Sequence, residues 1–240
     1  MYSDLRTLAL IPARGGSKGL PRKNVLEIAG KPLIAWTIEA ALASDHIDAV
    51  VVTTDDPEIA ELARAHGAEV PFLRPAELAL DTSPSIDAVL HALDALAADG
   101  RTFDFLALLE PTSPLRAPGD IDRAIELLAA NEADADAVVS LGEVHMEHPS
   151  IVKRIADGRL EPYVVESAKV TRRQDLDRAY FPYGVVYLSK VSSLRETKSF
   201  YPERTMPMLI ERWQNYEIDD VYDMVCVDAI LSYRHKENAE

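Results

Sequence analysis

The sequence has a single cysteine and no long apolar run. Cys226 is the only cysteine among 240 residues, which rules out an internal disulfide and any metal site built from several cysteines. No stretch approaches the roughly 18 consecutive apolar residues of a membrane-spanning helix. The opening MYSDLRTLALIPA, with an early acid and a short apolar stretch, is unlike a secretory signal. We therefore expect a cytoplasmic protein in which Cys226, within the apolar run MVCVDAIL, is a buried core thiol.

Positive charge is also scarce. The chain has 25 Lys plus Arg against 40 Asp plus Glu, a formal net charge of −15. Such a charge repels polyphosphate, which argues against nucleic acid or an anionic membrane as a partner. An anionic ligand then requires a local basic site or a divalent cation. The 48% hydrophobic content and the length predict one large globular domain, or one domain with a small insertion.

Short apolar runs alternate with amphipathic segments along most of the chain. Nearly continuous apolar runs predict strands that are buried on both faces, at residues 7–13, 48–54, 103–109 and 136–141. Helical periodicity with start and stop residues predicts helices at 32–44, 57–67, 85–100, 119–131 and 220–236. This order predicts a three-layer α/β fold with a mostly parallel, Rossmann-like sheet. Ligands of such folds bind at the carboxyl ends of the strands.

The pattern changes after Leu141. Two strand-like runs flank Asp157-Gly158, a pair typical of a two-residue hairpin turn, and a further strand follows at 184–189. We interpret residues 142–182 as an antiparallel insertion whose exposed strands serve dimerisation. Residues 1–141 and 183–240 would then form the α/β domain.

The opening loop, IPARGGSKGLPRKN, is the one purely basic stretch. Between Asp4 and Glu27 the chain has five basic residues and no acidic one. A glycine-rich turn after a buried strand exposes backbone N–H groups that can hold phosphate. A Walker A loop is excluded because Gly30-Lys31 is followed by Pro32, and the G-x-G-x-x-G fingerprint is absent. The loop is therefore either a solvated turn or a triphosphate site in which Arg14, Lys18, Arg22 and Lys23 surround small residues.

This loop, together with the GKPLI that follows it, resembles the signature of the acylneuraminate cytidylyltransferases, the CMP-sialic acid synthetase family. Five later segments resemble the family in the same order: TTDD (53–56), RPAELALDTSPSID (74–87), LLEPTSPLR (108–116), TRRQD (171–175) and YEIDDVYD (216–223). The resemblance implies a homodimeric nucleotidyltransferase that converts CTP and a nine-carbon 2-keto-3-deoxy sugar acid to a CMP-sugar and pyrophosphate. Sialic acid is the first candidate for the sugar. Legionaminic acid, pseudaminic acid, CMP-KDO synthesis and a catalytically silent CTP-binding paralogue remain alternatives.

The resemblance also implies roles for individual residues. Arg14, Lys23 and Asp219 would be catalytic. The nucleotide would contact Ala13, Arg14, Gly15, Gly16, Ser17, Lys18, Lys23, Asn24, Arg74 and Ser85. The sugar would contact Glu110, Thr112, Ser113, Arg116, Arg172, Arg173, Gln174 and Tyr183. Glu217 and Asp219 would bind Mg²⁺, which takes oxygen ligands from one or two carboxylates plus phosphate.

Some of these residues have a structural alternative or depart from the family pattern. Arg116 can instead be a structural ion-pair residue, and Asp219 can instead cap the last helix. Glu110 stands where the family commonly has Gln, Asp177 where Pro is common, and Tyr183-Gly184 where Asn-Gly is common. These departures lie beside the expected sugar pocket, so the sequence leaves the identity of the sugar open.

Overall fold

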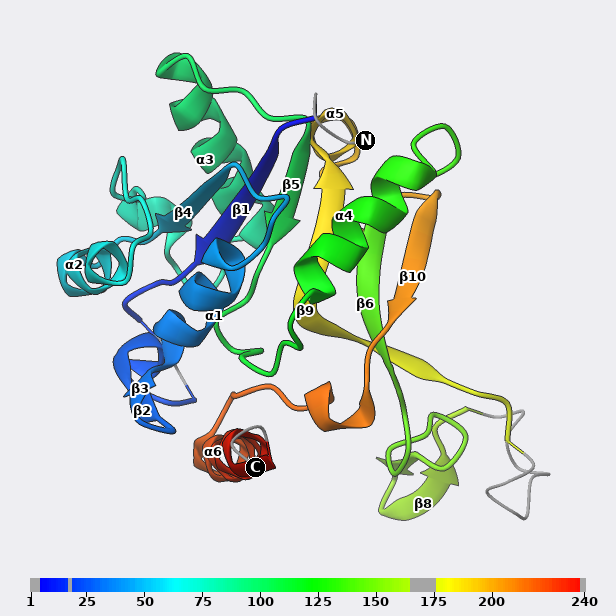
Figure 1. The fold of residues 1–240 in the computed structure, drawn as a ribbon. Helices are drawn as coiled ribbons and strands as arrows, with labels where there is room; N and C mark the ends of the chain where they lie inside the picture. Colours follow the sequence, from blue (N-terminus) through cyan, green and yellow to red (C-terminus); the bar gives the residue numbers. More distant parts are fainter. Residues whose placement is uncertain (1–4, 17–18, 165–175, 238–240) are drawn as a thin grey trace.

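The computed structural model describes residues 5–16, 19–164 and 176–237, and its centre is a six-stranded sheet (Figure 1). The strand order is β10-β6-β9-β5-β1-β4. β9 runs antiparallel to both of its neighbours, and the other adjacent pairs are parallel. The strands are β1 (Thr7–Pro12), β4 (Ala49–Thr53), β5 (Phe105–Leu108), β6 (Ala137–Glu143), β9 (Tyr180–Lys190) and β10 (Thr205–Leu209).

Helices cover both faces of this sheet. In β1, Ala9 and Ile11 pack into one apolar cluster, whereas Leu8 and Leu10 pack into the other, as the two-residue period of a strand requires. The first cluster is closed by α1 (Leu33–Leu42), α2 (Pro57–Ala65) and α4 (Asp120–Ala130). The second is closed by α3 (Ser85–Ala98) and α5 (Val191–Thr197). The three-layer, mostly parallel α/β fold predicted from the sequence is confirmed.

Helix α2 shows how its boundaries follow from the sequence. The carboxylate of Asp56 accepts hydrogen bonds from the backbone N–H groups of Glu58 (2.8 Å) and Ile59 (3.3 Å), which have no partner within the helix. Pro57 occupies the first helical position, where its missing N–H costs nothing. The chain leaves the helix through Gly67 at φ 93°, a left-handed conformation that favours glycine.

One helix and one strand of the fold have weak sequence signals. Neither α5 nor β10 was predicted from the sequence. β10 contains Pro207, which cannot donate to a central ladder, and the strand lies at the edge of the sheet beside β6. The antiparallel direction of β9 has a consequence for the site, because the first half of this strand reaches the same edge as the carboxyl ends of β1, β4 and β5.

The predicted insertion contains the expected hairpin. Strands β7 (Lys153–Ala156) and β8 (Arg159–Pro162) pair antiparallel. Their turn residues Asp157 (φ 51°) and Gly158 (φ 73°) both have left-handed backbones, as a type I′ turn requires. The β6–β9 ladder extends to the pair Glu143 and Tyr180, so the predicted boundaries fall within it. The division into a domain and an arm stays a prediction.

Helix α6 (Val221–Glu237) lies below the edge of the sheet at which β1 ends (Figure 1). Its buried side chains include Val227 and Leu231, one helical turn apart. Cys226 is exposed on the other side of the helix, so the prediction of a buried thiol is wrong: a helix turns adjacent residues to different faces even within an apolar run. Within the described ranges no helix, α6 included, is long and apolar enough to cross a membrane.

Two smaller parts complete the described chain. A two-stranded sheet pairs β2 (Glu27–Ile28) with β3 (Lys31–Pro32) just before α1. Three short 3-10 helices connect larger elements: η1 (Lys23–Val25), η2 (Ala76–Leu78) and η5 (Arg212–Gln214). The first belongs to the opening loop, so part of that loop has regular backbone structure.

The cap of α2 yields a stability prediction. Replacing Asp56 with Ala should lower the free energy of unfolding by about 1 kcal/mol, because two backbone N–H groups lose their acceptor. Urea denaturation measures this difference. Arg22→Ala, which removes the exposed ion pair between Arg22 and Asp56 (3.2 Å), is the control and should cost less than about half as much. Equal losses in the two variants would assign the effect to the ion pair and contradict the cap.

Candidate active site

A cavity opens at the edge of the sheet where β1 and β5 end. Its volume is about 280 Å³. The walls come from the loop after β1, the segment from Arg74 to the start of α3, and the loop after β5. Among the residues singled out from the sequence it is lined by Arg14, Gly16, Lys23, Asn24, Arg74, Ser85, Glu110 and Thr112. The fold therefore gathers most of the expected nucleotide contacts with two of the expected sugar contacts.

The cations of the opening loop have acidic partners from distant segments. Arg14 Nη1 lies 2.7 Å from Asp81 Oδ1, and Lys23 Nζ lies 3.1 Å from Asp219 Oδ1. Arg22 contacts Glu58 at 2.6 Å and points away from the cavity walls named above. Such partly exposed pairs contribute little stability. An anionic ligand can therefore replace the acidic partners of Arg14 and Lys23 at small cost.

The loop backbone is fixed to its neighbours. The N–H of Ala13 donates to the carbonyl of Thr53 (3.0 Å), and the N–H of Gly15 donates to Asp55 Oδ1 (3.0 Å). Within the loop, Asn24 Nδ2 donates to the carbonyl of Arg14 (3.1 Å). Asn24 is buried, so its amide holds the loop closed in the way expected of a turn residue. Ser17 and Lys18 lie outside the described residues.

Gly19 brings the loop against the late acidic segment. A Cβ added to Gly19 would lie 2.2 Å from the carbonyl oxygen of Asp219, so no other residue fits there without moving the backbone. The loop and the acidic segment are nearly 200 positions apart in the sequence, as the bond between Lys23 and Ile218 also shows. The sequence analysis did not identify Asp55 and Asp81 as partners of the loop. Their signal was their place inside the matched TTDD and RPAELALDTSPSID segments.

Arg74 forms a buried positive wall of the cavity. Its Nε donates to Thr53 Oγ1 (3.2 Å), and its Nη2 donates to the Thr53 carbonyl (2.5 Å). Burial lowers the pKa of this guanidinium, Asp55 raises it, and Arg14 lowers it further. Since arginine remains protonated despite such shifts, Arg74 adds a fixed positive charge beside Arg14. Ser85 begins α3 and also lines the cavity, so its position is compatible both with the expected nucleotide contact and with a place in the first turn of the helix.

A cluster of polar residues lies beside Glu110, which lines the cavity. Glu217 Oε1 accepts hydrogen bonds from the hydroxyl of Ser113 (2.5 Å) and from the N–H of Gly184 (2.6 Å). Ser113 is buried, so its hydroxyl is committed to Glu217. A Cβ on Gly184 would lie 2.4 Å from Glu110 Oε2, which explains why glycine follows Tyr183. The two carboxylates of Glu110 and Glu217 thus share one small region of the protein.

Glu110 is held in an environment that disfavours its charge. Burial and then the nearby Glu217 carboxylate raise its pKa to about 7, against the opposing effects of Arg116 and Lys23, with Asp219 adding to the rise. Near neutral pH the side chain is therefore divided between the acid and the carboxylate. The protonated form carries no charge and donates a hydrogen bond, so it would repel an anionic sugar less than a carboxylate would.

Arg116 is half-buried and does not line this cavity. Its guanidinium donates to the carbonyls of Val185 (2.7 Å), Glu110 (2.9 Å) and Gly184 (2.9 Å), and to Thr37 Oγ1 (2.8 Å). Burial lowers its pKa to about 10, with Glu110 acting in the opposite direction. Because these bonds occupy the fork of the guanidinium, the geometry supports the structural alternative and not a sugar contact. Its partners are backbone carbonyls and a hydroxyl, so the role differs from the ion pair considered in the sequence.

The acidic side chains of the segment 216–223 have different partners. Asp220 Oδ1 accepts from the N–H groups of Tyr222 (2.7 Å) and Asp223 (3.1 Å), and Asp223 Oδ2 accepts from those of Asp219 and Asp220. These two residues therefore cap α6. The Asp219 side chain is 86% exposed, and among the described residues its carboxylate contacts Lys23. Capping is thus assigned to the neighbours of Asp219.

The fit to Mg²⁺ differs between the two expected ligands. In the part of the chain that the structure describes, no three His, Cys, Asp or Glu side chains form a ready metal cage. Mg²⁺ needs no such cage when phosphate oxygens complete its coordination, and the exposed Asp219 suits that arrangement. Glu217 faces Ser113 and Gly184 instead.

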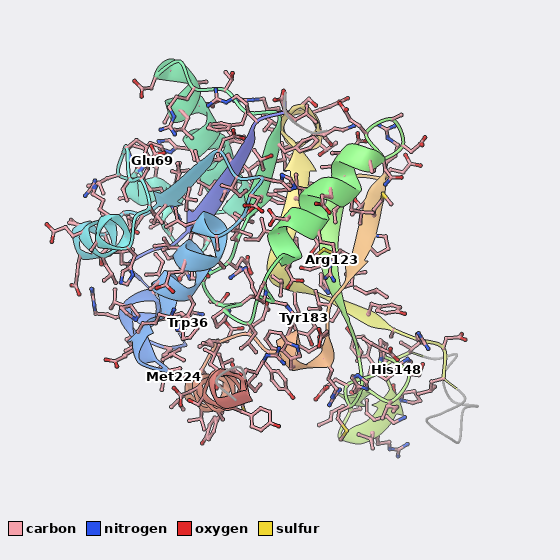
Figure 2. The ribbon with its side chains drawn as sticks, in the orientation of Figure 1. Trp36, Glu69, Arg123, His148, Tyr183 and Met224 are labelled. Carbon is pink, nitrogen blue, oxygen red and sulfur yellow. The ribbon has the colours of Figure 1, made fainter. Side chains whose placement is uncertain are left out.

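The remaining expected sugar contacts lie beside this cluster or outside the described residues. Arg172, Arg173 and Gln174 fall in the segment that the structure does not describe. Tyr183 is half-buried at the end of the sheet nearest α6, with its ring edge-on to Phe181 at 5.0 Å (Figure 2). Burial raises the pKa of Tyr183, and Glu217 adds to the rise.

The raised pKa of Glu110 yields a pH-dependent prediction. The folded-state pKa of about 7 exceeds the ordinary value of 4.5. The contribution of Glu110 to the free energy of unfolding is therefore fully present below pH 4.5 and is lost as the pH rises through 7. Glu110→Gln removes this loss. From pH 5 to pH 8 the free energy of unfolding of the variant should therefore rise by about 2 kcal/mol relative to the unmodified protein. Urea denaturation across this range measures it, with the exposed Glu77→Gln as reference. A constant difference for Glu110→Gln would contradict the buried, raised-pKa carboxyl.

Relatives of known activity match nearly the whole chain. The family model described as cytidylyltransferase covers residues 8–235. The chain is 37% identical to the CMP-N,N'-diacetyllegionaminic acid synthase of Legionella pneumophila, across 95% of this chain and 97% of that enzyme. It is 33% identical to the N-acylneuraminate cytidylyltransferase of Escherichia coli O18:K1:H7, across 98% of this chain but only 54% of that longer enzyme. It is 30% identical to the pseudaminic acid cytidylyltransferase of Campylobacter jejuni, across 97% and 99% of the two chains.

Solved structures share the fold. A CMP:2-keto-3-deoxy-manno-octonic acid synthetase complexed with CTP superposes with a TM-score of 0.70 at 19% identity, over 95% of this chain and 99% of the other. A 4-diphosphocytidyl-2C-methyl-D-erythritol synthase gives 0.64 at 15% identity, with the same coverage. The resemblance found in the sequence motifs is confirmed by the sequence relatives, and the chain belongs to the cytidylyltransferase family of nucleotidyltransferases.

Proposed function

We propose that this nucleotidyltransferase transfers CMP from CTP to a sialic-acid-type, nine-carbon 2-keto-3-deoxy sugar acid. The observation that carries the proposal is the cavity at the edge of the sheet, where Arg14, Lys23 and Arg74 converge from three segments. It lies in a chain whose relatives at 30–37% identity are named for legionaminic, acylneuraminic and pseudaminic acids. A pyrophosphate-release assay with CTP and a panel of these sugar acids tests it.

The proposed reaction joins two anions. An oxygen of the sugar's anomeric hydroxyl bonds to the α-phosphorus of CTP, the bond from that phosphorus to the bridging oxygen breaks, and pyrophosphate leaves. The hydroxyl proton passes to a base or to water. Catalysis of such a step depends on alignment and charge neutralisation. Arg14 and Lys23 would exchange their exposed acidic partners for the phosphates, and the buried Arg74 would supply a charge that stays in place.

We propose Mg²⁺ as the cofactor. The exposed Asp219, next to Lys23 at the cavity, is the side chain best placed to hold it together with phosphate oxygens. The bound ion would offset the negative charge of the triphosphate and the nearby acids. Asp219 would then act on the phosphates through the metal ion, whereas Lys23 would contact them directly.

The sugar is proposed by class. Glu110 lines the cavity with a pKa raised to about 7 by burial, so its protonated form can donate to a carboxylate or hydroxyl of the sugar. A Gln at this position would donate at every pH, whereas Glu110 donates only while protonated. Comparison of the unmodified protein with Glu110→Gln across the sugar panel therefore reports whether this position selects the sugar.

A catalytically silent, CTP-binding paralogue is the second candidate function. It would retain the cavity and CTP binding. The presence of Arg14, Lys23 and Asp219 around the cavity favours the enzyme. CTP binding without pyrophosphate release from any sugar of the panel would support the paralogue.

We further propose that the protein is a cytoplasmic homodimer joined through the hairpin of β7 and β8. Ile155 and Leu160 are directly paired across the hairpin, and their exposed fractions are 81% and 72%. Directly paired residues share one face, so two large apolar side chains stand together in solvent. Further exposed apolar residues occur around the base of the hairpin: Met146, Tyr163 and Phe181. Such a patch is typical of an interaction surface.

Lys23 provides the central activity prediction. Lys23→Ala should lower kcat by about 100-fold, because one fixed positive charge on the phosphates is lost. Steady-state pyrophosphate release measures the change, and thermal denaturation checks the fold. Arg22→Ala is the matched control, since it removes a charge of the same loop that contacts Asp56 and Glu58 outside the cavity. Equal losses of activity in both variants would count against a specific role for Lys23.

The hairpin provides a prediction on assembly. The double variant Ile155→Asp, Leu160→Asp should shift the protein from dimer to monomer, because two charges cannot be buried without partners. Sedimentation velocity measures the mass. Arg154→Ala, on the same hairpin but paired with Glu161, should leave the dimer intact. A dimer unchanged by the double substitution would remove this face from the interface.

A further inference from the structure

The carboxylate of Glu217 is directed into the protein, unlike that of its neighbour Asp219. Its Oε1 accepts from the hydroxyl of Ser113 at 2.5 Å and from the N–H of Gly184 at 2.6 Å. Ser113 is 1% exposed and Glu217 is half-buried, so the contact is partly shielded from solvent. These donors come from the loop after β5 and from β9. Glu217 thus connects three segments that are far apart in the sequence.

The residues around Glu217 extend the same connection. The N–H of Ile218 donates to the carbonyl of Thr112 (2.8 Å), while the Ile218 side chain is fully buried. The carbonyl of Ile218 in turn accepts from Lys23 Nζ at 2.6 Å. Residues 217 and 218 therefore attach this segment to β9 and the loop after β5 on one side, and to the opening loop on the other. Asp219 is the first residue beyond that attachment.

Two short hydrogen bonds to one carboxylate oxygen stabilise the Glu217 side chain in this position. Bonds to an ionised acceptor are stronger than neutral ones, and here they compensate the burial of the charge. A cation that took Glu217 as a ligand would compete with both donors. The Asp219 carboxylate differs, because its donor among the described residues is the partly exposed ammonium of Lys23.

We propose that Glu217 is a positioning residue and not a metal ligand: it anchors the segment that presents Asp219 to the cavity. Its two hydrogen bonds set the distance between the loop after β5, β9 and the acidic segment. In this assignment Asp219 is the one carboxylate of the pair that meets Mg²⁺, and the coordination is completed by phosphate and water. The assignment rests on the proposed cytidylyltransferase reaction for its catalytic meaning, but the anchoring itself is a property of the free protein.

Four variants separate an anchor from a ligand. Glu217→Gln keeps a carbonyl oxygen that can accept from Ser113 and Gly184 but removes the anionic ligand. Glu217→Ala removes both properties. Ser113→Ala removes one donor and leaves the Glu217 carboxylate in place, and Asp219→Asn serves as the ligand control. Each is compared by Mn²⁺ titration in electron paramagnetic resonance, with and without CTP, and by thermal denaturation without metal.

If Glu217 is an anchor, the conservative variant Glu217→Gln should retain metal binding and activity. Glu217→Gln should bind Mn²⁺ within about threefold of the unmodified protein, whereas Asp219→Asn should bind at least about tenfold more weakly. Without metal, Glu217→Ala and Ser113→Ala should melt at lower temperature, and Asp219→Asn should not. In turnover, Glu217→Gln should keep most of its kcat, while Glu217→Ala should lose roughly 10- to 100-fold.

A ligand predicts a different pattern. If Glu217→Gln weakened Mn²⁺ binding as strongly as Asp219→Asn, the assignment would be overturned. Metal-free melting temperatures unchanged by Glu217→Ala and Ser113→Ala would overturn it as well. If Glu217→Gln fails to fold, Ser113→Ala decides the question through the same two measurements. Absence of pyrophosphate release from the unmodified protein would reject the proposed function but leave the metal-free melting comparison valid.

Discussion

Two partly exposed ion pairs at the edge of the sheet are the interaction on which the proposed site depends. Arg14 and Lys23 come from a loop without acids, and the structure supplies their counter-charges from Asp81 and Asp219. These pairs are partly exposed and weak, so they keep two cations in place without consuming their binding capacity. Gly19 allows the loop to touch the backbone of Asp219 directly. An acidic protein can thus offer an anion site without a large positive surface.

The antiparallel strand β9 connects the region of this cavity to the hairpin of β7 and β8. Its first half brings Gly184 beside Glu110 and Glu217, and its beginning pairs with the end of β6 at the base of the hairpin arm. A wholly parallel sheet would place the start of that strand at the opposite edge. The same strand therefore closes the polar cluster and carries the arm.

Much of the architecture was predictable because its signals are local. Apolar runs and the Asp56 cap gave the central strands and α2, and Asp157-Gly158 gave the hairpin turn. Cys226 was misplaced because a continuous apolar run hides which face of a helix is buried. β10 went unnoticed because its proline weakens the strand pattern, and an edge strand tolerates it.

The site was predictable in its residues but not in their contacts. The motifs of the resemblance identified eight of the residues that line the cavity, and the loop chemistry gave a physical reason for Arg14 and Lys23. The bond between Ser113 and Glu217 joins residues 104 positions apart, so spacing gives no indication of it. The hydrogen bonds of Arg116 to backbone carbonyls were equally hidden, since a sequence does not show which partners an arginine has.

A crystal structure of the protein with CTP and Mg²⁺ tests the central claim most directly. The account predicts that the triphosphate lies in the cavity between Arg14 and Lys23, with both side chains released from Asp81 and Asp219 and turned to phosphate oxygens. A nucleotide bound away from the loop after β1, or bound there with both ion pairs intact, would contradict it.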